Sequence, residues 1–224
     1  MADFLIRLPA TALVLAFALA LPARAADPGA GLQPTSGAET SAPKAETPAA
    51  SPSAPAKPGI ASDDRKATLN ALFDALKRER NPEKAREISG QIRLEWAESG
   101  SATVNFLMLQ AAKAIAENRQ TSALDFYDQV IALAPDYSEG WNGRATLHYQ
   151  MNNYRKSMSD INHVLQIEPR HFGALAGMAT ILTTMDKPEL AVRVWEKFLE
   201  IYPAERKAQE ELNTLQEKVA GSRT

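Results

Sequence analysis

A spacing of 34 residues recurs along this chain and constrains its fold more than any other feature. Pro135, Pro169 and Pro203 are separated by this step. The same step joins five further columns of mostly small or apolar residues: Ala111, Ala145 and Ala179; Ala123, Ser157 and Ala191; Val130, Val164 and Phe198; Ile131, Leu165 and Leu199; and Leu107, Trp141 and Leu175. Columns that stay in phase over three copies indicate an internal repeat, in which each unit buries an apolar face against its neighbours.

Each copy has the apolar spacing of two helices. In the middle copy one helical face carries Trp141, Ala145, His148 and Tyr149, and a second carries Ser157, Ile161, Val164 and Leu165. Short polar breaks separate the two helices at Glu117-Asn118, Asn152-Asn153 and Asp186-Lys187-Pro188. The second helix is expected to end at the proline of its copy, because proline cannot continue a helix. The small columns would let the two helices of a copy approach closely.

The pattern resembles the tetratricopeptide repeat (TPR) family. The residues that carry the resemblance are Trp141, Ala145, Tyr149, Tyr154, Ser157, Ile161, Val164 and Pro169. It covers three copies, 104–137, 138–171 and 172–205. Leu107 and Leu175 replace the usual aromatic residue, and Gln110 and Met178 stand in the column of Arg144. The resemblance implies an all-α fold, a right-handed α-solenoid of stacked helix-turn-helix repeats.

Helices are also expected on both sides of the three copies. Residues 63–103 are interpreted as a divergent TPR-like helix pair that precedes the repeats. Its packing positions are Leu69, Leu72 and Leu76 in the first helix and Ala85, Ile88 and Ile92 in the second. Residues 206–224 are expected to form a C-terminal capping helix and tail, with Ala208, Leu212, Leu215 and Val219 on its apolar side. A polar outer side suits the end of a repeat array.

The first part of the chain has the features of an export signal followed by a spacer. Residues 1–25 contain a short apolar run that ends at Pro22, then Ala23-Arg24-Ala25, a sequence that a signal peptidase accepts. Residues 26–62 are rich in proline, alanine and serine, which predicts a disordered linker. The chain is therefore expected to be exported, to the periplasm of a Gram-negative bacterium, without stable membrane insertion after cleavage. Retention of the signal as an anchor is the alternative.

The resemblance also implies where a partner would bind, because the first helices of TPR arrays line a concave groove. Residues offset from the packing columns are expected there: Asn105, Met108, Ala112 and Ile115; Glu139, Asn142, Thr146, Tyr149 and Gln150; and Gly173, Ala176, Thr180 and Thr184. Asn105, Met108, Asn142, Thr146, Tyr149, Gln150, Thr180 and Thr184 are the candidate binding residues. No Lys or Arg stands at these positions, which disfavours recognition of an acidic peptide terminus.

Other kinds of chemistry have little support in the sequence. The formal net charge is −2 and cysteine is absent, so the chain is too balanced for a nucleic-acid partner and has no disulfide or thiolate metal site. His148 is expected as a packed residue, His163 as an outward-facing one and His171 as a cap or a solvated loop residue. Asp128 and Asp160 are interpreted as helix-surface carboxylates. No catalytic residue, metal or cofactor is predicted.

The predicted function is that of a scaffold or adaptor in the cell envelope, which binds a protein or peptide and is not an enzyme. Two alternatives stay open at this point. One is a regulatory or accessory subunit of an envelope enzyme, and the other is a structural spacer that forms homo-oligomers.

Overall fold

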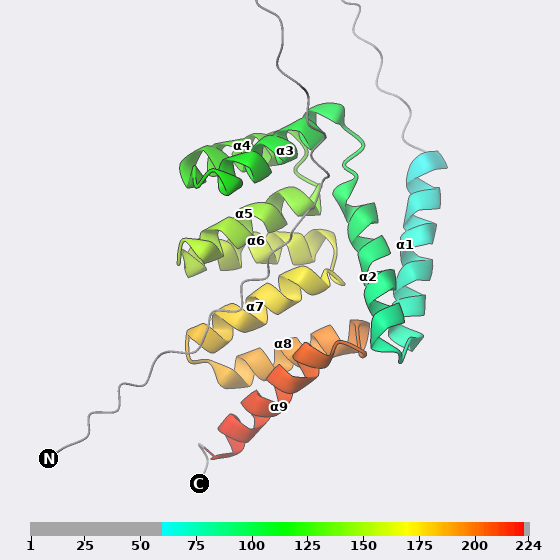
Figure 1. Cartoon of the computed structure of the whole chain (residues 1–224), viewed down its shortest axis with the longest axis vertical. Helices are drawn as coiled ribbons and strands as arrows, with labels where there is room; N and C mark the ends of the chain where they lie inside the picture. Colours follow the sequence, from blue (N-terminus) through cyan, green and yellow to red (C-terminus); the bar gives the residue numbers. More distant parts are fainter. Residues whose placement is uncertain (1–59, 222–224) are drawn as a thin grey trace, which may run out of the picture. The chain divides into compact units, whose positions relative to one another are not determined.

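The computed structural model describes residues 60–221, so the predicted signal peptide and most of the predicted linker lie outside the described residues. Within this range the chain is all-α. Its helices are α1 (Ile60–Arg78), α2 (Pro82–Ala97), α3 (Ala102–Ala116), α4 (Gln120–Leu133), α5 (Ser138–Gln150), α6 (Tyr154–Ile167), α7 (Phe172–Thr184), α8 (Pro188–Ile201) and α9 (Arg206–Gly221) (Figure 1). Because α1 begins at Ile60, it includes the last three residues of the predicted linker. No helix in this range has the length and apolar content needed to cross a membrane.

The three predicted copies are the helix pairs α3–α4, α5–α6 and α7–α8, and the predicted solenoid of stacked helix pairs is therefore present. Asn118, Asn152 and Asp186 occupy the turn inside each pair, with φ values of 56°, 59° and 53°. Asn and Asp tolerate this left-handed conformation better than most residues. The next residue then donates its backbone N–H to the preceding helix; Arg119 bonds to Ala114 at 2.8 Å, as in a Schellman motif.

The small columns lie where the two helices of a pair meet. All six of their members are at most 2 % exposed: Ala111, Ala145 and Ala179 on the first helices, and Ala123, Ser157 and Ala191 on the second. Ser157 also donates its hydroxyl to the backbone oxygen of Ala145 at 2.8 Å, which satisfies the one polar group in the column. The second helices end at Leu133, Ile167 and Ile201, each two residues before the proline of its copy.

The N-terminal helix pair was predicted to precede the repeats as a further, divergent copy, but it does not extend their stack. The predicted packing residues Leu76, Ala85 and Ile92 are fully buried. However, α1 lies against α8 and α2 against α5, and neither helix packs side by side with α3. In Figure 1 the two helices cross the ends of the other pairs. We call α1 and α2 together the N-terminal hairpin.

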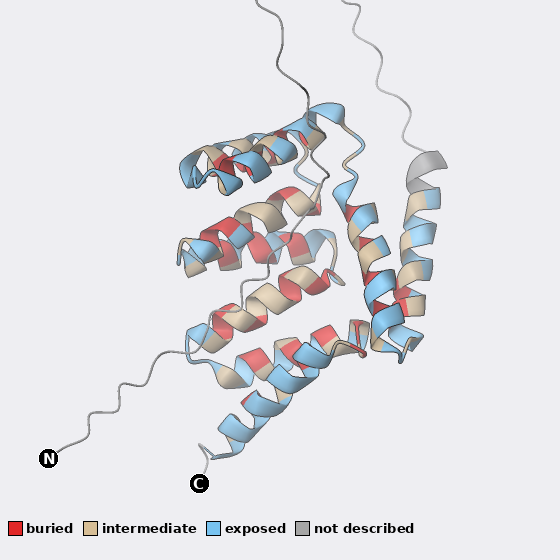
Figure 2. Cartoon of the chain, in the orientation of Figure 1, coloured by how far each residue is buried: buried red, intermediate tan, exposed pale blue. Residues whose placement is uncertain are grey.

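A single large apolar cluster joins the N-terminal hairpin to the C-terminal part of the stack. It contains buried residues of α1, α2, α7, α8 and α9, among them Phe73, Trp96, Phe172, Trp195 and Leu215. The predicted capping helix is present as α9, which packs on α8 through Ala208 and Leu215. Figure 2 shows buried residues on the sides where helices meet and a largely exposed outer side of α9.

Candidate functional site: the first-helix face and the Arg144 cluster

The predicted binding residues all lie on α3, α5 and α7, and none of them is buried. Thr146, Gln150 and Thr184 are exposed, whereas Asn105, Met108, Asn142, Tyr149 and Thr180 are half-buried. We call the predicted groove positions of these three helices the first-helix face. Their partial exposure leaves them accessible to another molecule.

Many polar groups of the first-helix face already have partners within the chain. The hydroxyls of Thr146, Thr180 and Thr184 each donate to the backbone oxygen four residues earlier, at 2.9 Å. Such a hydroxyl can still accept a hydrogen bond. Asn105 is bound to the residues that link α2 and α3, because it accepts from Ser99 at 2.6 Å. The amide of Asn105 is therefore engaged in hydrogen bonds within the chain.

The N-terminal hairpin lies over one end of the first-helix face. The indole of Trp96 stacks on the ring of His171, which precedes α7, with centroids 4.1 Å apart. The guanidinium of Arg93 lies 5.8 Å from the ring centre of Phe172, and Tyr137 donates its hydroxyl to the backbone oxygen of Ala97 at 2.8 Å. The hairpin thus lies at the N-terminal ends of α5 and α7, and leaves open their C-terminal halves.

His171 is both a cap and a buried hydrogen-bond donor. Its Nδ1 accepts the backbone N–H of Ala174 at 3.0 Å, so in the neutral ring the proton is on Nε2. Nε2 then donates to Glu139 at 2.9 Å. The prediction that His171 is a helix cap is confirmed, but its ring is 2 % exposed and therefore not solvated. Trp96, which is distant in the sequence, covers it.

The carboxylate of Glu139 is held by several donors. Burial by itself raises its pKa, but the hydrogen bond from His171, the amide of Asn142 and the charge of Arg93 together lower the pKa below its ordinary value. Asn142 donates to the second carboxylate oxygen at 3.0 Å. Glu139 is thus committed to the contact between α5 and α7, and it is not free to receive a cationic ligand.

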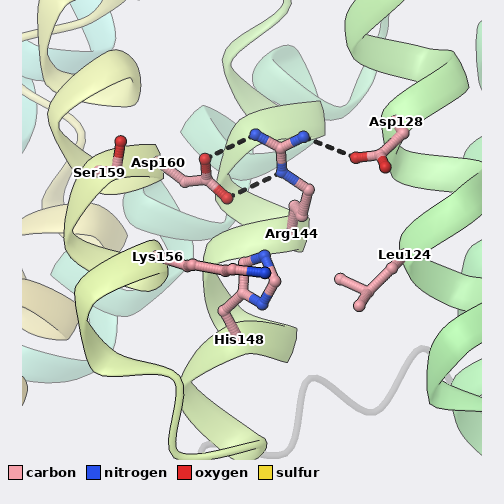
Figure 3. Close-up of a pocket in the computed structure, with 7 residues that line it drawn as sticks. All are labelled: Leu124, Asp128, Arg144, His148, Lys156, Ser159 and Asp160. Carbon is pink, nitrogen blue, oxygen red and sulfur yellow. Dashed lines mark hydrogen bonds and ion pairs between the residues drawn. The ribbon is translucent and has the colours of Figure 1, made fainter.

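A second candidate site lies between the second helices α4 and α6, with α5 at its floor (Figure 3). Arg144 of α5 pairs with Asp160 of α6 through two nitrogens, at 2.9 and 2.7 Å, and with Asp128 of α4 at 2.6 Å. The hydrogen bonds to Asp160 are the main reason why the pKa of Arg144 lies above its usual value. Its guanidinium also covers the ring of Trp141, 5.0 Å from the ring centre.

The pocket beside this cluster has a volume of about 360 Å³ and is lined by Leu124, Asp128, Arg144, His148, Lys156, Ser159 and Asp160. The charges of its two cationic and two anionic side chains cancel, and the two carboxylates already bind three nitrogens of Arg144. His148 is 6 % exposed, and its Nδ1 is buried without a hydrogen-bond partner. Burial lowers the pKa of the His148 ring, which therefore stays neutral near pH 7. The arrangement joins three helices and contains no nucleophile with an activating base.

The cluster corrects part of the sequence reading. Asp160 is 4 % exposed, so it is not a helix-surface carboxylate as expected, whereas Asp128 is exposed. His148 is packed, as expected. His163 is exposed, as expected, but its ring stacks on Trp141 with centroids 4.2 Å apart. One feature of the sequence could have predicted this ion pair. Arg144 stands in a repeat column that is otherwise filled by the uncharged residues Gln110 and Met178, and a charge at such a position needs a partner on a neighbouring helix.

Comparison with known proteins identifies the family. No family model matches the chain. A TPR repeat-containing protein of Rhizobium etli is 61 % identical over 164 residues, which cover 73 % of this chain and 80 % of the relative. This chain belongs to the TPR proteins.

Solved structures agree with this TPR fold. The first TPR domain of Spaghetti (RPAP3), determined with the HSP90 peptide SRMEEVD, superimposes with a TM-score of 0.51 at 20 % identity, over 54 % of this chain and 95 % of that domain. The Sgt2 TPR domain from Aspergillus fumigatus gives a TM-score of 0.50 at 18 % identity, over 55 % of this chain and 83 % of that domain. At this level of identity the likeness concerns the fold.

Proposed function

We propose that this TPR protein is a non-catalytic adaptor, whose first-helix face binds a peptide or protein segment that carries few acidic groups. The observation that carries the proposal is the open half of that face. There Thr146, Gln150 and Thr184 are exposed beside the half-buried Tyr149 and Thr180. The N-terminal hairpin covers the opposite end, so a partner would lie over the C-terminal halves of α5 and α7.

The chemistry of the open half favours an uncharged ligand. Hydroxyls and an amide can meet the backbone N–H and C=O groups of an extended peptide, and Tyr149 adds apolar area with a polar tip. The HSP90 peptide in the Spaghetti structure, SRMEEVD, is acidic near its end. No Lys or Arg stands on the first-helix face of this chain. A segment rich in hydroxyl, amide and small apolar side chains therefore fits better.

We also infer that the chain works outside the cytoplasm. The support is the apolar run and small-residue site within residues 1–25. N-terminal sequencing of the protein purified from its own cells is expected to begin at Ala26. A protein that begins at Met1 and stays in the cytoplasm would contradict the inference.

The binding proposal is tested by crosslinking in cells, with a photoreactive residue at Tyr149 and, as a control, at Asn162 on the exposed side of α6. The partner captured from Tyr149 is identified by mass spectrometry, purified and titrated calorimetrically. We expect Thr146→Glu to weaken its binding at least tenfold, because a buried unpaired charge is costly. The matched control is Asn162→Glu, which should bind as the parent does. Equal effects of the two substitutions would place the binding surface elsewhere.

A further inference from the structure

The outer side of α3 differs from the corresponding sides of α5 and α7. Three columns of the repeat point toward the preceding helix pair: Phe106, Gly140 and Ala174; Leu109, Gly143 and Gly177; and Lys113, Leu147 and Ile181. In α5 and α7 these positions face the second helix before them. A Cβ on Gly140 would lie 2.6 Å from Val130, and one on Gly177 would lie 3.4 Å from Ile161.

On α3 the same positions are uncovered. Phe106 and Leu109 are each 57 % exposed, and Lys113 is exposed as well, whereas Leu147 and Ile181 are at most 1 % exposed. We call Phe106, Leu109 and Lys113 the α3 end face. The N-terminal hairpin does not cover it, because α2 packs on α5 and α1 on α8. In Figure 2 the outer side of the α3–α4 pair is coloured largely as exposed.

The side chains of the α3 end face exclude a further repeat stacked in series. In α5 and α7 the first two columns hold only Gly or Ala, so that the preceding second helix can come close. Phe106 and Leu109 would hold such a helix away. The opposite end of the stack is closed by α9, whose exposed residues are Glu, Gln, Lys, Arg, Asn, Thr, Ala and Gly. Head-to-tail assembly would place the apolar α3 end face of one copy against the polar α9 end of the next. Such a contact would have an apolar surface on one side only.

We propose that the α3 end face binds the same face of a second copy, so that the protein is a two-fold symmetric dimer. A two-fold contact uses one patch twice and closes after two subunits. Two antiparallel α3 helices centred between Leu109 and Gln110 would place Phe106 of each copy opposite Lys113 of the other. A lysine over an aromatic ring is attractive. Lys113 is the only charged residue of α3, so like charges do not oppose the approach.

The size of the face limits the strength of the dimer. A helix of 15 residues is about 22 Å long, and two such helices bury less area than a typical stable interface of about 1,600 Å². The dimer is therefore concentration-dependent. A dimer would present two first-helix faces. A partner that carries two binding segments would bind both faces at once and would therefore bind the dimer more tightly than a single copy. The dimer itself does not depend on the proposed function.

Sedimentation equilibrium of residues 26–224, from about 10 µM to about 1 mM, tests the proposal over the range expected for a weak interface. We expect the mass to rise from one chain to two and then to stop. Phe106→Glu and Leu109→Glu are expected to remain single chains. Leu133→Glu, at an equally exposed leucine of α4 (60 % exposed), is the matched control and should dimerise as the parent does. Circular dichroism shows whether each variant is folded.

A second measurement uses the absence of cysteine in this chain. Leu109 lies beside the proposed two-fold axis, so the Leu109→Cys variant is expected to form a disulfide-linked dimer rapidly on mild oxidation. Leu94→Cys, at a leucine of α2 that is 74 % exposed, should crosslink no faster than free collision allows. The proposal is overturned by a single-chain mass at every concentration. It is also overturned by masses that grow beyond two chains, or by equal behaviour of the glutamate variants and their control.

Discussion

Trp96 and His171 form a stacked pair, with ring centroids 4.1 Å apart and planes inclined by 9°. Trp96 belongs to α2 and His171 caps α7, so the pair joins the N-terminal hairpin to the third helix pair. Both rings are nearly inaccessible to solvent, at 6 % and 2 % exposure. The indole Nε1 has no hydrogen-bond partner, so ring contact and apolar burial hold the hairpin at this point.

Replacing Trp96 should therefore destabilise the fold. Trp96→Ala is expected to lower the free energy of unfolding by about 3–5 kcal/mol, because it removes a large buried ring and leaves a cavity. Urea denaturation followed by circular dichroism measures this loss. Leu94→Ala, on the same helix but 74 % exposed, should change the free energy by less than about 0.5 kcal/mol. Similar losses in the two variants would show that the hairpin is not docked through Trp96.

The two carboxylates that bind Arg144 should differ in their contribution to stability. The side chain of Asp160 is 5 % exposed and that of Asp128 is 59 % exposed. Asp160→Asn is expected to cost about 3 kcal/mol, because it removes one charge of a buried pair. Asp128→Asn removes a solvent-screened contact and should cost at most about 1 kcal/mol. Thermal unfolding of both variants beside the parent gives the comparison, and equal losses would contradict the structure.

His148 should make stability depend on pH. Its folded-state pKa is lowered, first by burial, with Lys156 and Arg144 lowering it further and Asp160 and Asp128 acting in the opposite direction. The unfolded chain then binds the proton more readily. This contribution to stability is complete above the ordinary pKa of 6.5 and is lost as the pH falls through the lower folded-state value.

The prediction is tested with His148→Phe, which keeps a ring of similar size and removes both the titrating group and the unpartnered Nδ1. Denaturant midpoints measured from about pH 7 to about pH 5 should fall less steeply in this variant than in the parent. His163→Phe is the matched control, at an exposed histidine of α6. If His163→Phe removes the pH dependence and His148→Phe does not, the assignment to His148 is wrong.

Two helical glycines should respond oppositely to alanine. A Cβ on Gly143 would meet the ring of Tyr127, with Cζ 2.6 Å away, so Gly143→Ala forces α4 and α5 apart and should cost about 1–3 kcal/mol. On Gly90 of α2 a Cβ would meet only the end of the Arg93 side chain, at 4.0 Å. Gly90→Ala should stabilise the protein by about 0.5–1 kcal/mol through helix propensity. Chemical denaturation of both variants checks the signs.

Much of the fold followed from patterns that act over short distances in the chain. The 34-residue period predicted the three helix pairs, and Asn118, Asn152 and Asp186 do stand at the turns. The paired small columns predicted the close contacts of Ala145 and Ser157. The apolar positions of α1, α2 and α9 were also predicted, because 3.6-residue spacing shows which side of a helix must be buried.

The sequence by itself determined which residues form helices, where the turns lie and which side of each helix avoids water. Only the tertiary structure decided what covers each of these sides. The apolar side of α2 contacts His171 and Phe172 rather than α3, and the pairing of Arg144 with Asp160 likewise depends on how α5 and α6 meet. The physical reason is that hydrophobic burial rewards any apolar surface of suitable shape. Helical periodicity shows that one side of a helix must be covered by an apolar surface. Which helix supplies that surface depends on contacts between residues far apart in the chain.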